Sequence, residues 1–81
     1  MQVTVQFYSY FKDLTGCSAV GQELPPGSTL GDLVDQLGAR FPKLGALRKS
    51  MLAAVGVEYQ HRAYVLQDDD EVSLFPPVQG G

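Results

Sequence analysis

One segment with the apolar spacing of a helix lies between segments that alternate like strands, and this order restricts the folds open to the chain of 81 residues. The spacing i, i+3, i+4, i+7 and i+11 is typical of the buried face of an amphipathic helix. It predicts a helix from Leu30 to about Arg40, and Thr29 with Asp32 resembles a capping box at its start. The apolar residues with this spacing are Leu30, Leu33, Val34, Leu37 and Phe41.

Strand patterns occupy both ends of the chain. Residues 2–8 alternate strictly, with Val3, Val5 and Phe7 on one side of the pleat and Tyr8 on the other. Residues 71–75 form a second alternating segment. Weaker signals predict a helical turn within 9–16, strands over 18–24 and 52–57, an irregular or briefly helical connector over 44–50, and short extended pieces around 59–66.

Turn residues divide these elements. Two prolines and a glycine in the run 24–28 end a strand at a tight corner, and an acidic corner at 68–70 precedes the last strand. This order of elements predicts an α+β domain in which a mixed sheet is covered on one face by one main helix. The other sheet face is left to solvent or to a partner. We expect residues 1–75 to form the domain and residues 76–81 to form a flexible tail.

Composition restricts the classes of partner and the cellular location to be expected for this chain. Six Lys and Arg against nine Asp and Glu give a formal charge of −3, and the basic residues are scattered, with Arg48-Lys49 expected on a solvated helix edge. Nucleic acid and membrane surfaces are therefore not expected as partners. The single Cys17 allows no internal disulfide, and we find no targeting segment or apolar run of ~18 residues. The cytoplasm is the expected location.

The last residues are the most informative segment. Pro76 and Pro77 prevent further sheet pairing, and Val78 and Gln79 lead to Gly80 and Gly81, which have no Cβ to obstruct a narrow channel. A tail of this kind can reach roughly 20 Å at ~3.3 Å per residue. A free carboxylate on a thin end suits chemical modification inside another protein, although a frayed terminus that happens to end in two glycines is the plainer interpretation of these two residues alone.

The whole pattern resembles a known family. The ending Leu74-Phe75-Pro76-Pro77-Val78-Gln79-Gly80-Gly81, together with the segments 24–30 and 54–59, is similar to the MoaD/ThiS family of ubiquitin-like sulfur carriers, which includes the small subunits of molybdopterin synthases. The resemblance spans essentially the whole chain and implies a β-grasp fold.

The resemblance also implies a function that is not catalysis by this chain alone. A MoeB-like adenylating enzyme would activate the Gly81 carboxylate with ATP, and a sulfur donor enzyme would convert it to a thiocarboxylate. Residues 76–80 would then enter the MoaE-like large subunit, where the sulfur is transferred to cyclic pyranopterin monophosphate. Alternatives within the same chemistry are a carrier for thiazole, cysteine or thiolated tRNA, and a ubiquitin-like modifier joined to protein lysines.

Two positions depart from the family pattern. Gly56 stands where relatives often have Asn, and Asp69 stands where they often have a turn glycine. An Asp at that position either adopts a left-handed backbone conformation or changes the type of turn. We therefore expect these departures to affect loop shape and not the tail.

Phe75 is a candidate interface residue on independent grounds. A period of two places Val72 and Leu74 on the core face and Phe75 on the opposite face, beside the exit of the tail. An exposed aromatic ring at such a place favours a partner contact over an incidental surface position, and Tyr8 can join it from the first strand.

Other chemistry-bearing residues have plainer interpretations. His61 has no nearby metal-ligand partner in the sequence and is expected in a surface loop, and residues 68–71 lack the spacing of a calcium loop. No metal site is expected. Cys17 is expected to be a free loop thiol, with a sulfur relay as the weaker alternative. The chain has no phosphate-binding loop, so ATP is expected to belong to a partner.

Overall fold

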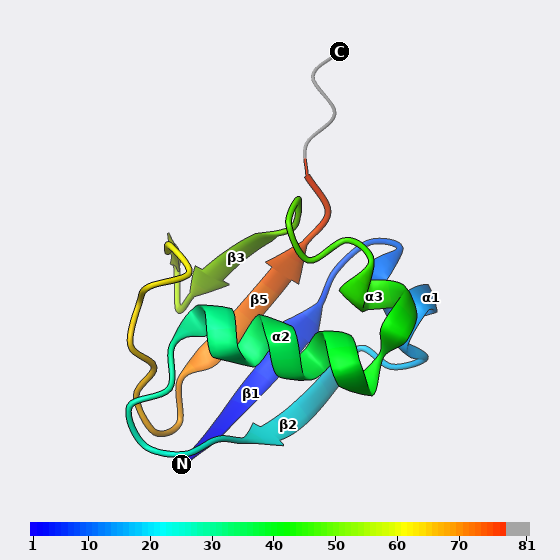
Figure 1. The fold of residues 1–81 in the computed structure, drawn as a ribbon. Coiled ribbons are helices and arrows are strands. Elements are labelled where there is room, and N and C mark those ends of the chain that lie inside the picture. The colour runs from blue at the N-terminus through cyan, green and yellow to red at the C-terminus, as the bar shows by residue number, and fades with distance from the viewer. Residues whose placement is uncertain (78–81) are drawn as a thin grey trace.

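The structure, a computed structural model, describes residues 1–77. Their five strands form one mixed sheet in the order β2-β1-β5-β3-β4 (Figure 1). The first and last strands, β1 (Gln2–Phe7) and β5 (Glu71–Phe75), lie side by side at its centre and are parallel. The outer strands are antiparallel to their neighbours: β2 (Ala19–Glu23), β3 (Leu52–Val55) and β4 (Glu58–Tyr59).

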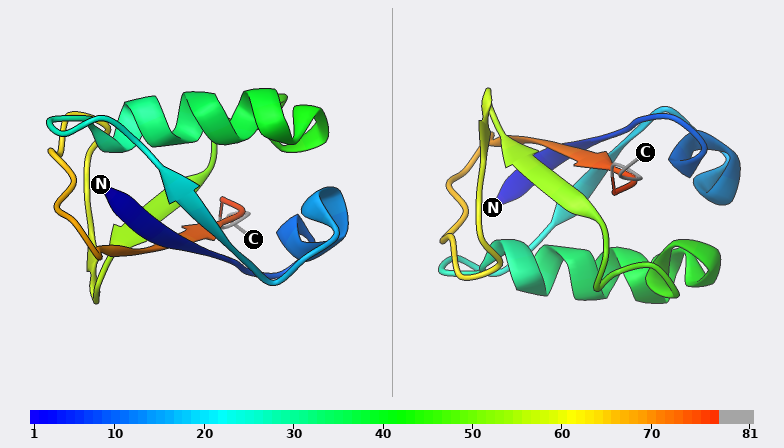
Figure 2. Two further views of the ribbon diagram at one scale, coloured as in Figure 1. Left: turned by 90° about the horizontal axis from the view of Figure 1, so that it is seen from below. Right: turned by 90° about the horizontal axis from the view of Figure 1, so that it is seen from above.

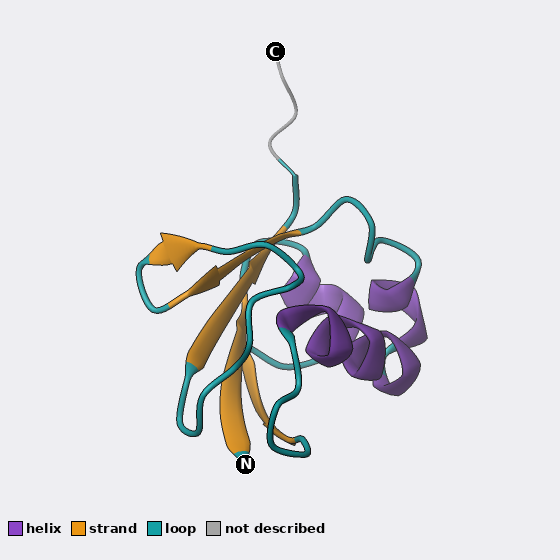
Figure 3. Cartoon of the chain, turned by 60° about the vertical axis from the view of Figure 1, so that its left-hand side comes forward, coloured by secondary structure: helices purple, strands orange, loops and turns teal. Residues whose placement is uncertain are grey.

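Within residues 1–77, three helices pack beside the sheet. The main helix α2 (Leu30–Arg40) crosses one face, whereas α1 (Phe11–Thr15) and α3 (Pro42–Gly45) are single turns. Figures 2 and 3 show α2 and α3 over one face of the sheet and α1 beside its end, with the opposite face free of helices. The predicted α+β fold is thus confirmed, as is the position of the main helix. Within residues 1–77, no helix is long and apolar enough to cross a membrane.

The core lies between the sheet and α2. The alternating residues of β1 and β5 face the apolar stripe of α2, as their patterns predict. The side chains with no measurable exposure are Val3, Val5, Phe11, Leu30, Leu33, Leu37, Val72 and Leu74.

The boundaries of α2 are set by local chemistry. The Thr29 hydroxyl accepts a hydrogen bond from the Asp32 N–H at 3.2 Å, and the Asp32 carboxylate accepts one from the Thr29 N–H at 2.9 Å. The predicted capping box is therefore present. At the other end, Phe41 donates its N–H to Leu37 O at 2.7 Å, and Pro42 begins α3. A proline is tolerated there because the first residues of a helix have no intrahelical acceptor for an N–H.

The structure corrects two predicted boundaries. The predicted strand 52–57 ends at Val55, because Gly56 adopts a left-handed conformation with φ of 62° and turns the chain into β4. The connector predicted over 44–50 begins earlier, as the helix α3. Arg48 and Lys49 lie in the turns that follow α3 and not on a helix edge.

The acidic corner is a structural turn that holds the start of β1. Asp69 adopts the left-handed conformation, with φ of 67°, and donates its N–H to Gln2 O at 2.8 Å. The Asp68 carboxylate accepts the Gln2 N–H at 2.8 Å. The Asp70 carboxylate accepts a hydrogen bond from the Tyr64 hydroxyl at 3.4 Å. The pKa of Tyr64 is raised, mainly by desolvation and then by the charge of this carboxylate and the hydrogen bond to it. Of the two outcomes predicted for Asp69, the structure thus shows the left-handed backbone conformation.

The capping box gives a first testable prediction. Thr29→Ala removes the hydroxyl acceptor and leaves the Asp32 N–H without its side-chain partner, so we expect the free energy of unfolding to fall by about 1 kcal/mol. Thr29→Ser keeps the hydroxyl and is the matched control. Chemical denaturation of the two variants measures the difference; equal stabilities would show that the cap contributes nothing.

Candidate functional site

The parallel pairing of β1 and β5 brings their carboxyl ends to one edge of the sheet. Phe7 lies opposite Leu74, and the next residue of each strand lies on the face without helices. Tyr8 continues the ladder by donating its N–H to Leu74 O at 3.2 Å. The rings of Tyr8 and Phe75 stack, with centroids 4.7 Å apart and an angle of 17° between their planes. The predicted outward orientation of Phe75, away from Val72 and Leu74, is confirmed.

Tyr59 completes an aromatic cluster that we define as Tyr8, Tyr59 and Phe75. Its ring meets that of Phe75 edge to face, with centroids 6.1 Å apart. Tyr59 is 67% exposed and Tyr8 is 39% exposed, whereas Phe75 is half-buried between them. An exposed group of three aromatic rings is well suited to contact with another protein.

Sequence reasoning missed Tyr59. The strand that carries it has two residues, too few to show a period. The signal that could have found it is the turn at Gly56: a hairpin closing there pairs Ala54 with Tyr59, which puts Tyr59 on the same face as Phe75.

A shallow hollow of about 310 Å³ adjoins the aromatic cluster. Its lining is mainly apolar and includes both tail prolines; the residues are Tyr8, Ser9, Tyr10, Leu52, Tyr59, Phe75, Pro76 and Pro77. None of them is a carboxylate, amine, imidazole or thiol. Its mainly apolar lining is suited to receiving an apolar side chain of a partner.

The rest of the helix-free face is polar. Thr4 and Glu71 are exposed, and the Gln6 side-chain amide donates to the Glu71 carboxylate at 2.7 Å. The Tyr8 hydroxyl donates to the side-chain oxygen of Gln6 at 3.0 Å, so the aromatic cluster is joined directly to this polar region. Exposed apolar surface on this face is thus concentrated where the tail begins.

The tail residues lie partly within the described chain. β5 ends at Phe75, and Pro76 and Pro77, both half-buried, follow it directly. The predicted channel residues Val78, Gln79 and Gly80 and the predicted modification site Gly81 lie outside the described residues, and their roles stay predictions. The structure places the start of the tail against the aromatic cluster.

The remaining candidates do not join this site. His61 lies exposed in the segment after β4, as predicted for a loop histidine. Cys17 is half-buried after α1, and its Sγ donates to Thr15 O at 3.7 Å. Within residues 1–77, no three His, Cys, Asp or Glu side chains are grouped as metal ligands would be.

Comparison of the sequence with known families and proteins shows which family the chain is similar to. The sequence model of the ThiS family matches residues 5–81. Full-length similarity extends to the molybdopterin synthase sulfur carrier subunits of Arabidopsis thaliana, 30% identical over 100% of this chain and 84% of that protein, and of Chlamydomonas reinhardtii, 31% identical over 100% of both. The small archaeal modifier protein 3 of Haloferax volcanii is 28% identical, also over 100% of both chains.

Solved structures share the fold. A putative molybdopterin converting factor subunit 1 from Pyrococcus furiosus superposes with a TM-score of 0.86 at 27% identity, over 96% of this chain and 99% of that one. Subunit 1 of the molybdopterin-converting factor from Helicobacter pylori, solved in a complex with subunit 2, gives a TM-score of 0.71 at 23% identity over 100% of both chains. These neighbours support the predicted β-grasp architecture.

The stacked rings can be tested by a double-mutant cycle. Tyr8→Ala and Phe75→Ala should show a coupling of about 1 kcal/mol in the free energy of unfolding, because each ring loses its partner in either single variant. Tyr64→Ala combined with Phe75→Ala is the control pair, and its effects should add. Denaturant titration gives all the values, and additivity for Tyr8 and Phe75 would contradict the stacking.

Proposed function

This chain belongs to the ThiS family of sulfur carriers, and from that membership we propose that it is the sulfur-carrier subunit of a molybdopterin synthase. Two relatives that bear this name are 30% and 31% identical to it over its full length. The observation that carries the proposal is the position of the aromatic cluster at the point where Pro76 and Pro77 leave the sheet. The proposed docking surface therefore lies where the tail begins.

The proposed chemistry takes place at Gly81. Its carboxylate attacks the α-phosphorus of ATP in a MoeB-like adenylating enzyme, releasing pyrophosphate and forming an acyl-adenylate. Hydrosulfide supplied by a donor enzyme then attacks the acyl carbon and displaces AMP, and loss of its proton leaves a thiocarboxylate. A carboxylate is a poor electrophile, so activation must precede sulfur transfer, and the thiocarboxylate sulfur is the stronger nucleophile that the next step needs.

The second partner is a MoaE-like large subunit. There the tail residues Pro76, Pro77, Val78, Gln79 and Gly80 occupy a channel, and the thiocarboxylate sulfur is transferred to cyclic pyranopterin monophosphate. The aromatic cluster supplies docking energy outside the channel. Since prolines restrict the backbone before binding, less conformational entropy is lost when the tail enters. We propose the cytoplasm as the location of these reactions.

Catalytic groups for these reactions belong to the partners. The hollow beside the aromatic cluster contains no carboxylate, amine, imidazole or thiol, and the sequence has no phosphate-binding loop. ATP is therefore a substrate of the adenylating enzyme and not a cofactor of this chain.

Two alternative functions would also use the carboxyl end at Gly81. A relative named as an archaeal modifier is similar over the full length, which favours conjugation of Gly81 to protein lysines as the second candidate function. A sulfur carrier for thiazole, cysteine or tRNA thiolation is the third. All three need an adenylated Gly81, and they differ in the molecule that receives the tail.

The proposed modification site is directly testable. After incubation with ATP, an adenylating enzyme and a sulfur source, the intact chain should gain the mass of one exchange of oxygen for sulfur at Gly81. Deletion of Gly81 should abolish the gain, whereas the control Cys17→Ser should retain it. Fragmentation mass spectrometry locates the sulfur. Sulfur found on Cys17, or in the truncated chain, would overturn the proposal.

The docking role of the aromatic cluster predicts a separation of folding from binding. Phe75→Asp should leave the domain folded, because this ring is outside the core, yet weaken the complex with the large subunit by ~2 kcal/mol or more. Thr4→Asp, on the polar part of the same face, is the control and should bind normally. Thermal unfolding and calorimetric titration measure the two effects. Normal binding by Phe75→Asp would exclude the cluster as an anchor.

A further inference from the structure

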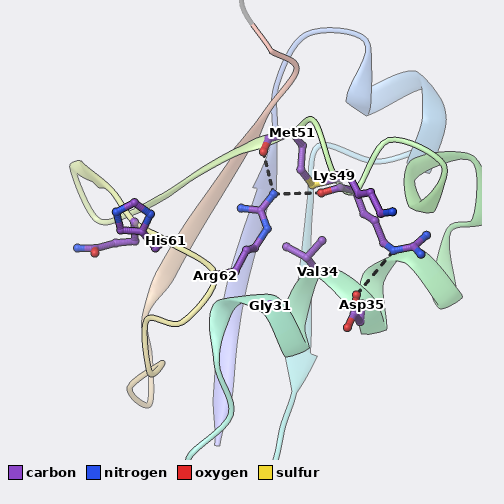
Figure 4. A pocket seen from close by; sticks show the side chains of 9 residues that line it. Gly31, Val34, Asp35, Lys49, Met51, His61 and Arg62 are labelled. Atoms are coloured by element: carbon purple, nitrogen blue, oxygen red, sulfur yellow. Dashed lines mark hydrogen bonds and ion pairs between the residues drawn. The ribbon is translucent and has the colours of Figure 1, made fainter.

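A hollow of about 590 Å³ lies on the helix side of the sheet. It is formed by α2, by the segment before β3 and by the segment after β4 (Figure 4). Gly31, Val34 and Asp35 line it from α2, and the others are Arg48, Lys49, Met51, Gln60, His61 and Arg62. We call it the basic hollow.

Its charge is opposite to that of the chain as a whole. Arg48, Lys49 and Arg62 are three of the six Lys and Arg residues, and His61 is the only histidine. Asp35 is the one carboxylate among the lining residues, out of nine Asp and Glu in a chain of net charge −3. It lies 3.9 Å from Arg48 Nε in an exposed pair, and three basic side chains with this one carboxylate leave the hollow a formal charge of +2. The fold therefore collects cations that the sequence scatters.

The hollow is held in shape by backbone contacts. Arg62 Nη2 donates to Met51 O at 2.8 Å and to Arg48 O at 3.1 Å, and Gly31 N–H donates to Arg62 O at 2.9 Å. A Cβ at Gly31 would lie 3.3 Å from Arg62 O, closer than ordinary van der Waals contact, so glycine permits this approach of α2 to the segment after β4. These hydrogen bonds connect α2, the segment before β3 and the segment after β4 in the free chain.

The basic hollow reaches the tail exit at one of its lining residues, Met51. Leu52 is paired with Phe75, so Met51, which precedes Leu52, lies at the edge of the sheet where Pro76 begins. The hydrogen bond from Arg62 to Met51 O connects the hollow to this edge. A protein that encloses the tail can therefore contact both the aromatic cluster and the hollow.

We infer that the basic hollow receives a carboxylate-bearing segment of the enzyme that activates the tail. The cations are spread along the hollow and do not converge on one point: Arg62 Nη2 is engaged by two carbonyls, and Arg48 Nη1 donates to Gly45 O at 3.2 Å. Lys49 and His61 are exposed. This arrangement fits several carboxylates along a peptide better than a single phosphate, which needs convergent donors. Opposite charges on the two proteins accelerate their encounter and fix its orientation.

The inference rests on the proposed function, and its test is adenylation of the purified full-length chain by the adenylating enzyme of the same organism. Pyrophosphate release is measured over a range of chain concentrations at roughly 50 mM and 500 mM NaCl, which differ strongly in screening. Arg48→Glu/Lys49→Glu should raise KM about tenfold at low salt with little change in kcat, because charges at an interface rim act on association. High salt should reduce the difference between this variant and the wild type.

Two further variants separate charge at the hollow from other effects. Lys12→Glu/Lys43→Glu changes the net charge equally with two exposed residues outside the hollow, and should alter KM less than twofold. Lys49→Glu alone leaves the hydrogen bonds of Arg48 and Arg62 in place and should raise KM by an intermediate factor. Thermal unfolding of each variant confirms that the domain is folded.

Four results would overturn the inference, and they differ in what they imply for the proposed function. A normal KM for the Arg48→Glu/Lys49→Glu variant, or an equal defect in the control pair, overturns the inference while the proposed function stands. A shift of the amide resonances of Lys49 and His61 on adding ATP or pyrophosphate to the chain alone would assign the hollow to a small anion and also overturn it. If the wild-type chain is not adenylated at all, the proposed function and this inference fail together.

Discussion

The parallel pairing of β1 with β5 at the centre of the sheet is the constraint on which the other features depend. It joins the two ends of the described chain and places the carboxyl ends of both strands at one edge. Tyr8 and Phe75 can stack only because Phe7 lies opposite Leu74, and a shift of this register by one residue would turn one of the two rings toward the core. The tail therefore begins beside an exposed aromatic surface.

In the proposed function, the folded domain supplies the docking surfaces and Gly81 carries the reaction. The aromatic cluster lies on the helix-free face, and the basic hollow, on the helix side of the sheet, reaches the tail exit at Met51. Two different contacts beside one exit would also allow successive partners to recognise the same chain through different combinations of surface.

Local signals predicted much of the fold, and tertiary contacts account for what was missed. The capping box and helical period fixed α2, and the period of two placed Phe75 opposite Val72 and Leu74, because these features depend on neighbouring residues alone. Tyr59 was missed since its strand is two residues long. The basic hollow was missed since Arg62 comes close to Arg48 only through the packing of the segment after β4 against α2 and the start of β3. Charges distant in sequence cannot be assigned to one surface without the fold.

A single-turnover reaction tests the proposed carrier role most directly. The chain bearing a thiocarboxylate at Gly81 is mixed with the MoaE-like subunit and cyclic pyranopterin monophosphate, and both the mass of the chain and the formation of the dithiolene product are followed. The proposal predicts that Gly81 returns to a carboxylate as product appears, in proportion to the sulfur transferred. A chain that keeps its sulfur in this mixture, or that is found joined through Gly81 to protein lysines in the native cell, would contradict it.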